Sequence, residues 1–118
     1  MKTILIVNDS DIINKIISRS LEKEGFKTVV AINGKEALEL LDKFEFHIVI
    51  TDVNMPEMDG IELTKKIREH KNYKFIPVIF LSGSEEPEML KRAKEAGSSA
   101  WLTLPFNVKT VVATINKF

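Results

Sequence analysis

The strongest constraint in this sequence is a regular alternation between two kinds of apolar segment. Short runs rich in Ile and Val are typical of buried strands, and longer stretches between them repeat their apolar residues at helical spacing. The predicted strands are Thr3–Asn8, Lys27–Ala31, His47–Thr51, Pro77–Leu81 and Ala100–Thr103. The pattern therefore predicts five strands and five helices in strict alternation.

The stretches between the strands carry apolar stripes of different strength. Three are clear: Ile12, Ile13, Ile16, Ile17 and Leu21; Ala37, Leu38, Leu41 and Phe44; and Val108, Val111, Val112 and Ile115. Leu63 with Ile67, and Leu90 with Ala93, mark two weaker helices. Stripes at this spacing place one apolar face of each helix against a core.

Turn and capping residues agree with these boundaries. Asn33 and Asp59 each precede a Glu by three residues, as an N-cap precedes its N3 partner. Gly25 and Gly97 stand where helices need a left-handed residue to end. Because continuous apolar strands need cover on both faces, we expect one α/β domain with a doubly wound, five-stranded parallel sheet.

Composition excludes several classes of function. The 17 Lys and Arg balance the 17 Asp and Glu, so the broad basic surface of a nucleic-acid or anionic-membrane binder is absent. The chain has no Cys and only two His, too few for a His-based zinc site without carboxylates. No apolar run approaches the roughly 20 residues of a membrane span. We expect a cytoplasmic protein without a membrane or nucleic-acid partner.

Polar residues follow the predicted strands where a parallel sheet binds its ligands, at the carboxyl ends. Asp9 comes after the first strand, Asp52 and Asn54 after the third, and Ser82 after the fourth. Two carboxylates, an amide and a hydroxyl suit a hard cation such as Mg²⁺. A nucleotide-phosphate cradle is disfavoured, because the segment after the first strand has no glycine.

These residues resemble a known family in order and in spacing. The matching motifs are Asn8-Asp9, Asp52-x-x-Met55-Pro56-x-x-Asp59-Gly60, Ser82 and Pro105-Phe106. They are similar to those of response-regulator receiver domains of two-component systems, above all the stand-alone, chemotaxis-type (CheY-like) receivers. The resemblance covers essentially the whole chain. It implies one receiver domain over residues 1–118 with the (βα)5 flavodoxin-like fold and no output domain.

The resemblance implies a role for each matching residue. Asp52 would accept a phosphoryl group from a kinase's phosphohistidine or from a small acyl phosphate. Asp9, Asp52 and the backbone carbonyl of Asn54 would hold Mg²⁺ or Mn²⁺, with Asn8 contributing through water. Ser82 would donate its hydroxyl to a phosphoryl oxygen.

The resemblance also implies partners. A sensor histidine kinase or a phosphotransfer protein would supply the phosphoryl group. A downstream target would bind the face formed by the fourth helix, the last strand and the last helix. Trp101 stands where the family has a rotamer-switching Tyr or Phe. We expect a monomer.

Two positions depart from the family pattern. The family usually has two acidic residues after the first strand, and here the first is Asn8. The residue before Pro105 is normally a Lys that pairs with the phosphoryl group, and here it is Leu104. Three carboxylates with one Lys, or two carboxylates alone, both have a formal charge of −2. We therefore hypothesise that the two substitutions compensate each other.

Other interpretations of the same residues stay open. Asp9 competes with Ser10 as the cap of the first helix, Ser82 could form a plain turn, and Trp101 could only fill the sheet edge. Leu104 favours a degenerate receiver that binds partners without phosphorylation. Phosphatases with an Asp nucleophile need a second Asp two residues on as general acid, and that position is Asn54. We therefore expect a signalling domain and no turnover enzyme.

Overall fold

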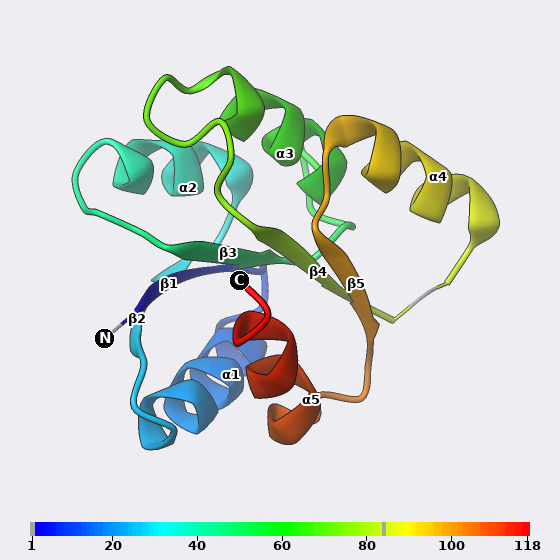
Figure 1. The fold of residues 1–118 in the computed structure, drawn as a ribbon. Coiled ribbons are helices and arrows are strands. Elements are labelled where there is room, and N and C mark those ends of the chain that lie inside the picture. The colour runs from blue at the N-terminus through cyan, green and yellow to red at the C-terminus, as the bar shows by residue number, and fades with distance from the viewer. Residues whose placement is uncertain (1, 84) are drawn as a thin grey trace.

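The structure is a computed structural model that describes residues 2–83 and 85–118. Strands and helices alternate strictly along these residues (Figure 1). Their bounds are β1 Thr3–Val7, α1 Asp11–Lys23, β2 Lys27–Ala31, α2 Gly34–Leu41, β3 Ile48–Thr51, α3 Gly60–Glu69, β4 Val78–Ser82, α4 Pro87–Ala96, β5 Ala100–Thr103 and α5 Val108–Ile115. The predicted elements are confirmed. No helix in this described part is long and apolar enough to cross a membrane.

The five strands form one parallel sheet in the order β2-β1-β3-β4-β5. Helices α1 and α5 cover one face, and α2, α3 and α4 cover the other (Figure 1). After β1 the chain adds β2 on one side of that strand, and it then adds β3, β4 and β5 on the other side. The direction in which strands are added therefore reverses between β1 and β3. That reversal is the switch point at which doubly wound sheets bind ligands.

Each face of the sheet has its own core. Successive side chains of a strand point to opposite faces, so β1 sends Leu5 and Val7 to the core beneath α2, α3 and α4. Ile4 and Ile6 pack in the core beneath α1 and α5. All four side chains are almost fully buried. This two-sided burial, which β3 and β4 share, explains why the three central strands are continuous apolar runs in the sequence.

Capping fixes where the helices begin and end. The side chains of Asn33 and Asp59 each accept the backbone N–H three residues on, which confirms the predicted caps of α2 and α3. Ser10 caps α1 by accepting the N–H of the third residue after it, so Asp9 is not the cap. Gly25 and Gly97 have φ angles of 95° and 101°, as their left-handed positions require.

Part of the stripe assignment is wrong. Ile12 and Ile16 are 71% and 52% exposed, because α1 lies on the sheet with its Ile17 and Leu21 side and turns these two residues outward. Phe44 is 53% exposed, because α2 ends at Leu41 and the following residues form a loop. A stripe of five apolar residues therefore includes more residues than the helix buries against the sheet.

Candidate functional site

The strand register brings the ends of β1 and β3 together. Val7 and Thr51 are Cα partners, and the Asp52 N–H donates to the Val7 carbonyl at 3.0 Å. The segments that follow these two strands therefore start side by side. Asn8 and Asp9 follow β1, and Asp52 follows β3. They lie at the switch point, on the carboxyl edge of the sheet, as the sequence predicts.

The surroundings of Asp52 disfavour the ionised form of its carboxyl group. Burial raises its pKa above the ordinary value, and the negative charge of Asp9 adds to that effect. The backbone N–H groups of Val53 and Asn54 oppose it, and the Val53 N–H donates to Asp52 Oδ1 at 2.7 Å. The fold thus orients this carboxylate while leaving its charge only partly compensated, which is the setting in which a cation is bound favourably.

Asp9 is exposed in the loop between β1 and α1. Ser10 supplies the helix cap, so the Asp9 carboxylate has no capping duty. Asn8 is buried, and its Oδ1 accepts the Ser10 N–H at 2.9 Å. Asn8 therefore shapes the loop that presents Asp9, and a contact from Asn8 to a metal through water stays a prediction.

A second buried asparagine, which was not predicted from the sequence, holds this loop. Asn14 of α1 is 2% exposed, and its Nδ2 donates to the carbonyls of Asn8 at 2.9 Å and Ala31 at 3.2 Å. Asn14 Oδ1 is buried without a hydrogen-bond partner among the described residues. The signal was a polar residue between Ile13 and Ile17 on the buried side of an amphipathic helix.

The Met55-Pro56-x-x-Asp59-Gly60 motif brings the start of α3 against the end of β3. Gly60 donates its N–H to the Val53 carbonyl at 2.8 Å. A Cβ at position 60 would overlap the Asp52 carbonyl oxygen and lie 3.1 Å from a ring carbon of Phe80. Only glycine allows this approach, so Gly60 fixes the backbone that carries Asp52.

Ser82 and Leu104 lie together on the other side of the site. Ser82 ends β4 and is 1% exposed, and its carbonyl accepts the Leu104 N–H at 2.8 Å. The Leu104 side chain packs against the core beneath α1 and α5 and lines a small hollow of about 10 Å³ together with Asp52. The position at which the resemblance implies a Lys is thus apolar and partly buried against that core.

Trp101 of β5 is half-buried and packs edge-to-face on Phe80, with ring centroids 5.5 Å apart. Phe80 in turn lies beneath Gly60. The predicted filling of the sheet edge by Trp101 is confirmed, and its switching role stays a prediction.

The donor set fits a hard divalent cation. Carboxylate and carbonyl oxygens are what Mg²⁺ takes from a protein, usually with several waters retained. No group of three or more His, Cys, Asp and Glu gathers as a metal site within residues 2–83 and 85–118. A cation at this edge would therefore be held by the two carboxylates of Asp9 and Asp52, and other oxygens would complete its shell.

A doubly wound parallel sheet with polar residues gathered at its switch point defines the class of α/β domains that bind their ligands at the carboxyl edge of the sheet. Within that class, the sequence profile of the response regulator receiver domain matches residues 4–116. The chain belongs to the response regulator receiver domain family of two-component systems.

Individual relatives support membership of the same family. The transcriptional regulatory protein SrrA of Staphylococcus aureus is 36% identical over 112 residues, which are 95% of this chain and 45% of SrrA. The chemotaxis protein CheY4 of Vibrio cholerae has a TM-score of 0.95 and 37% identity, covering 99% of this chain and 98% of that one. A receiver domain of a histidine kinase from Syntrophus aciditrophicus has a TM-score of 0.91 and 31% identity, covering 99% and 89%.

These relatives differ in what surrounds the shared domain. The chain spans about half the length of the curated relatives it matches. One similar structure is a chemotaxis protein, and another is a receiver domain of a histidine kinase. Receiver domains similar to this chain therefore occur in different kinds of protein.

Proposed function

We propose that this domain relays a signal by accepting a phosphoryl group on Asp52 in the presence of Mg²⁺ or Mn²⁺. The observation that carries the proposal is the position of Asp52 at the switch point, half-buried and close enough to Asp9 for the two charges to interact. A carboxylate placed for structural reasons alone would gain from a cationic partner, and the described residues provide none here.

The proposed reaction is an in-line phosphoryl transfer. An Asp52 carboxylate oxygen attacks the phosphorus of a phosphohistidine, the new O–P bond forms, and the P–N bond breaks to release the donor imidazole. The Val53 N–H on Oδ1 holds the carboxylate in one orientation during the attack. A cation held by Asp9, Asp52 and the Asn54 carbonyl would neutralise the charge that gathers on the phosphoryl oxygens.

Ser82 is the proposed link to the rest of the molecule. Its hydroxyl would donate to a phosphoryl oxygen, and its backbone is bonded to Leu104 just beyond β5. Movement at Ser82 therefore reaches the face formed by α4, β5 and α5, where we place the downstream target. Because the donor would be a sensor histidine kinase or phosphotransfer protein, we propose a cytoplasmic location and no turnover of outside phosphoesters.

The substitutions Asn8 and Leu104 are proposed to compensate each other. A hydrogen bond from a Lys to the phosphoryl group would be worth roughly 1.5–3 kcal/mol. Leu104 forgoes it, and Asn8 removes one carboxylate that would otherwise crowd Asp9 and Asp52. Leu104→Lys alone and together with Asn8→Asp should change Mg²⁺ affinity non-additively. Purely additive effects would refute the coupling.

The decisive experiment titrates Trp101 fluorescence with Mg²⁺ and then with Mg²⁺ plus beryllofluoride, which mimics an aspartyl phosphate. Intact mass after incubation with acetyl phosphate counts phosphoryl groups directly. We expect saturable responses and a single added phosphoryl group, both lost in Asp52→Asn. Asp59→Asn is the matched control, since it alters a carboxylate of the same loop while keeping a good helix cap. No added mass on the wild-type chain would favour a receiver that binds partners without phosphorylation.

A further inference from the structure

Two loops at the amino-terminal edge of the sheet, opposite Asp52, enclose an open hollow. The α2–β3 loop leads into β3, and the α3–β4 loop leads into β4. Together they line an open hollow of about 660 Å³, the basal hollow, formed by residues 41–47 and 71–76. The proposed phosphorylation chemistry uses none of these residues.

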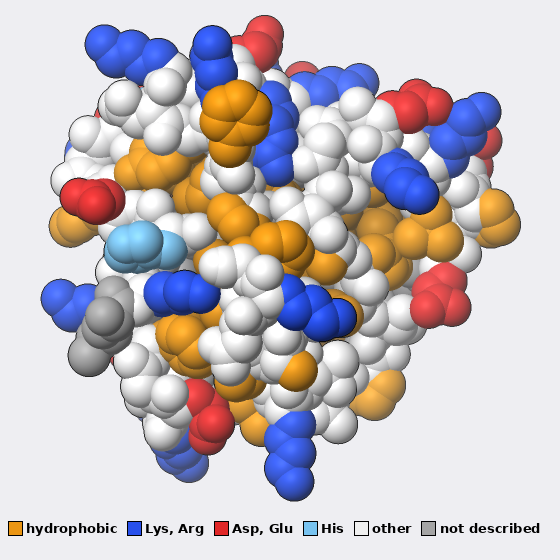
Figure 2. All heavy atoms as spheres, in the orientation of Figure 1, with side chains coloured by type: hydrophobic (Ala, Val, Ile, Leu, Met, Phe, Trp, Pro, Cys, Tyr) orange, Lys and Arg blue, Asp and Glu red, His pale blue; other side chains and the backbone are white. Residues whose placement is uncertain are grey.

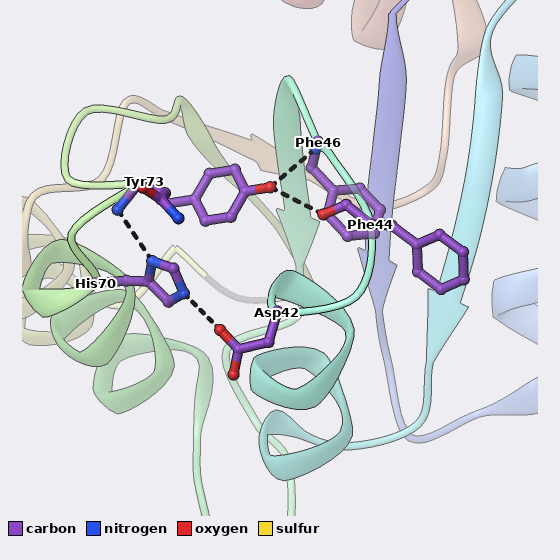
Figure 3. Close-up of polar contacts among 6 residues, drawn as sticks. Asp42, Phe44, Phe46, His70 and Tyr73 are labelled. Carbon is purple, nitrogen blue, oxygen red and sulfur yellow. Dashed lines mark hydrogen bonds and ion pairs between the residues drawn. The ribbon is translucent and has the colours of Figure 1, made fainter.

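Side-chain hydrogen bonds brace the two loops against each other (Figure 3). The Tyr73 hydroxyl donates to the Phe44 carbonyl at 2.9 Å and accepts the Phe46 N–H at 3.2 Å. His70 Nε2 lies 2.8 Å from Asp42 Oδ1. These contacts join loops that are about 30 residues apart in the sequence, so the hollow is held in shape before anything binds, which lowers the entropic cost of binding.

The contact between His70 and Asp42 also engages one of the two acidic groups that line the hollow. His70 Nδ1 accepts the Asn72 N–H at 3.1 Å, which leaves Nε2 to carry the ring proton and donate to Asp42. The Asp42–His70 contact is therefore a hydrogen bond that the ring donates, and it fixes the Asp42 carboxylate in place without removing its negative charge. Asp42 and Glu45 are the two acidic residues that line the hollow.

The charge that remains is basic. Lys43, Lys71 and Lys74 all line the hollow, and none has a carboxylate at ion-pair distance in residues 2–83 and 85–118. The three lysines outnumber the two carboxylates that line the hollow, those of Asp42 and Glu45, so a local excess of positive charge remains on a chain whose formal net charge is zero. Such a surface attracts a partner of opposite charge.

Exposed aromatic rings accompany these lysines. Phe75 is 93% exposed and Phe44 is 53% exposed, although both belong to loops that the braces hold in place. Figure 2 shows hydrophobic side chains at the surface over the α3–β4 loop, with Lys and Arg side chains beside them. Exposed aromatic side chains are enriched at protein interfaces, where they form the apolar anchoring positions, and charged residues lie in the polar rim around them.

We propose that the basal hollow is a docking site for an acidic peptide segment of another protein, a segment that carries an aromatic or large aliphatic side chain. The apolar side chain of the segment packs against Phe44 and Phe75. Its carboxylates face Lys43, Lys71 and Lys74. Because β3 separates this edge from Asp52, docking here is independent of the phosphorylation state and can occur while a kinase or target occupies the other edge.

The test uses the ¹⁵N-labelled chain and a short synthetic peptide that has a Trp and a Leu among several Glu residues. We expect saturable amide shifts in residues 42–47 and 70–76, unchanged by Mg²⁺ and beryllofluoride. A peptide with Lys in place of Glu, and one with Ser in place of the two apolar residues, should each bind about tenfold more weakly. Shifts that map elsewhere, or equal binding of all three peptides, would overturn the proposal.

Variants locate the site on the chain. Phe75→Ser, and Lys71→Glu with Lys74→Glu, should each weaken binding about tenfold. The matched controls, Ile12→Ser and Lys91→Glu with Lys94→Glu, make the same changes at exposed positions on α1 and α4 and should leave binding unchanged. Sedimentation of the free chain tests whether a second copy of the chain binds to this surface instead. A dimer that Phe75→Ser dissolves would assign the surface to a second copy and would overturn the acidic partner. The peptide-binding measurement does not depend on Asp52. Its result would therefore stand even if Asp52 accepted no phosphoryl group.

Discussion

Gly60 gives the sharpest test of how the fold holds Asp52. Gly60→Ala adds one methyl group at the point where α3 meets the end of β3. That methyl would overlap the Asp52 carbonyl oxygen and crowd Phe80 at 3.1 Å. The backbone there has little freedom to move, because the Asp52 N–H is bonded to Val7 and the Gly60 N–H to Val53.

The expected cost follows from two opposing effects. Replacing Gly by Ala restricts the unfolded chain and stabilises the fold by about 0.4–1 kcal/mol where the space is free. Overpacking costs about 1–3 kcal/mol, and a contact with fixed backbone belongs at the upper end. We expect Gly60→Ala to lower the free energy of unfolding by about 2 kcal/mol, which for a domain of this size lowers Tm by roughly 8 °C.

Two other glycines supply graded controls. At Gly34 an added Cβ would meet the Met58 sulfur at 2.6 Å, and that flexible side chain can move aside. At Gly83 nothing lies within 4 Å. Urea and thermal unfolding should therefore rank the variants Gly83→Ala, Gly34→Ala and Gly60→Ala in order of increasing cost. A Gly60→Ala chain as stable as Gly83→Ala would refute the claim that this contact fixes the site.

Three further predictions follow from single side chains. Because burial raises the pKa of Asp52, the folded state binds its proton more tightly than the unfolded state, and stability falls as pH rises through the window above the ordinary value of 3.8. Without divalent cations, Asp52→Asn should therefore be more stable than wild type at pH 7 in urea unfolding, and this advantage should shrink towards pH 4. Asp59→Ala removes the α3 cap and should cost about 1 kcal/mol, whereas Asp59→Asn should cost little; equal losses would contradict the capping role. Arg68 donates to the Gly97 and Ile76 carbonyls, so Arg68→Met should cost about 2–3 kcal/mol, and Arg68→Lys should recover only part because it lacks the forked geometry.

The fold could be predicted from the sequence because its signals are local and mutually consistent. Strands buried on both faces have to be continuous apolar runs, and helix ends need particular residues such as Asn33 and Gly97. The exposure of Ile12 and Ile16 could not be predicted, since it depends on how α1 is rotated on the sheet. An apolar stripe reports which residues can be buried, and packing decides which of them are.

The site could be predicted only as far as topology determines it. Parallel strands place all their carboxyl ends on one edge, so the approach of Asp9 to Asp52 follows from the strand order. The hold that Asn14 exerts on the Asn8 carbonyl is a contact between a helix and a loop, and no spacing rule reports it. The packing of the partly buried Leu104 against the core likewise depends on side chains from several elements.

The same parallel topology separates two kinds of function on this small domain. Every carboxyl end of the sheet lies on the edge of Asp52, so chemistry that needs several converging polar groups is confined there. The loops at the amino-terminal edge share no strand end with that site. Tyr73 braces them to each other rather than to the edge that carries Asp52. A change in Phe75 or Lys74 can therefore alter a partner without altering Asp52, and this independence is what the paired titrations with and without beryllofluoride measure.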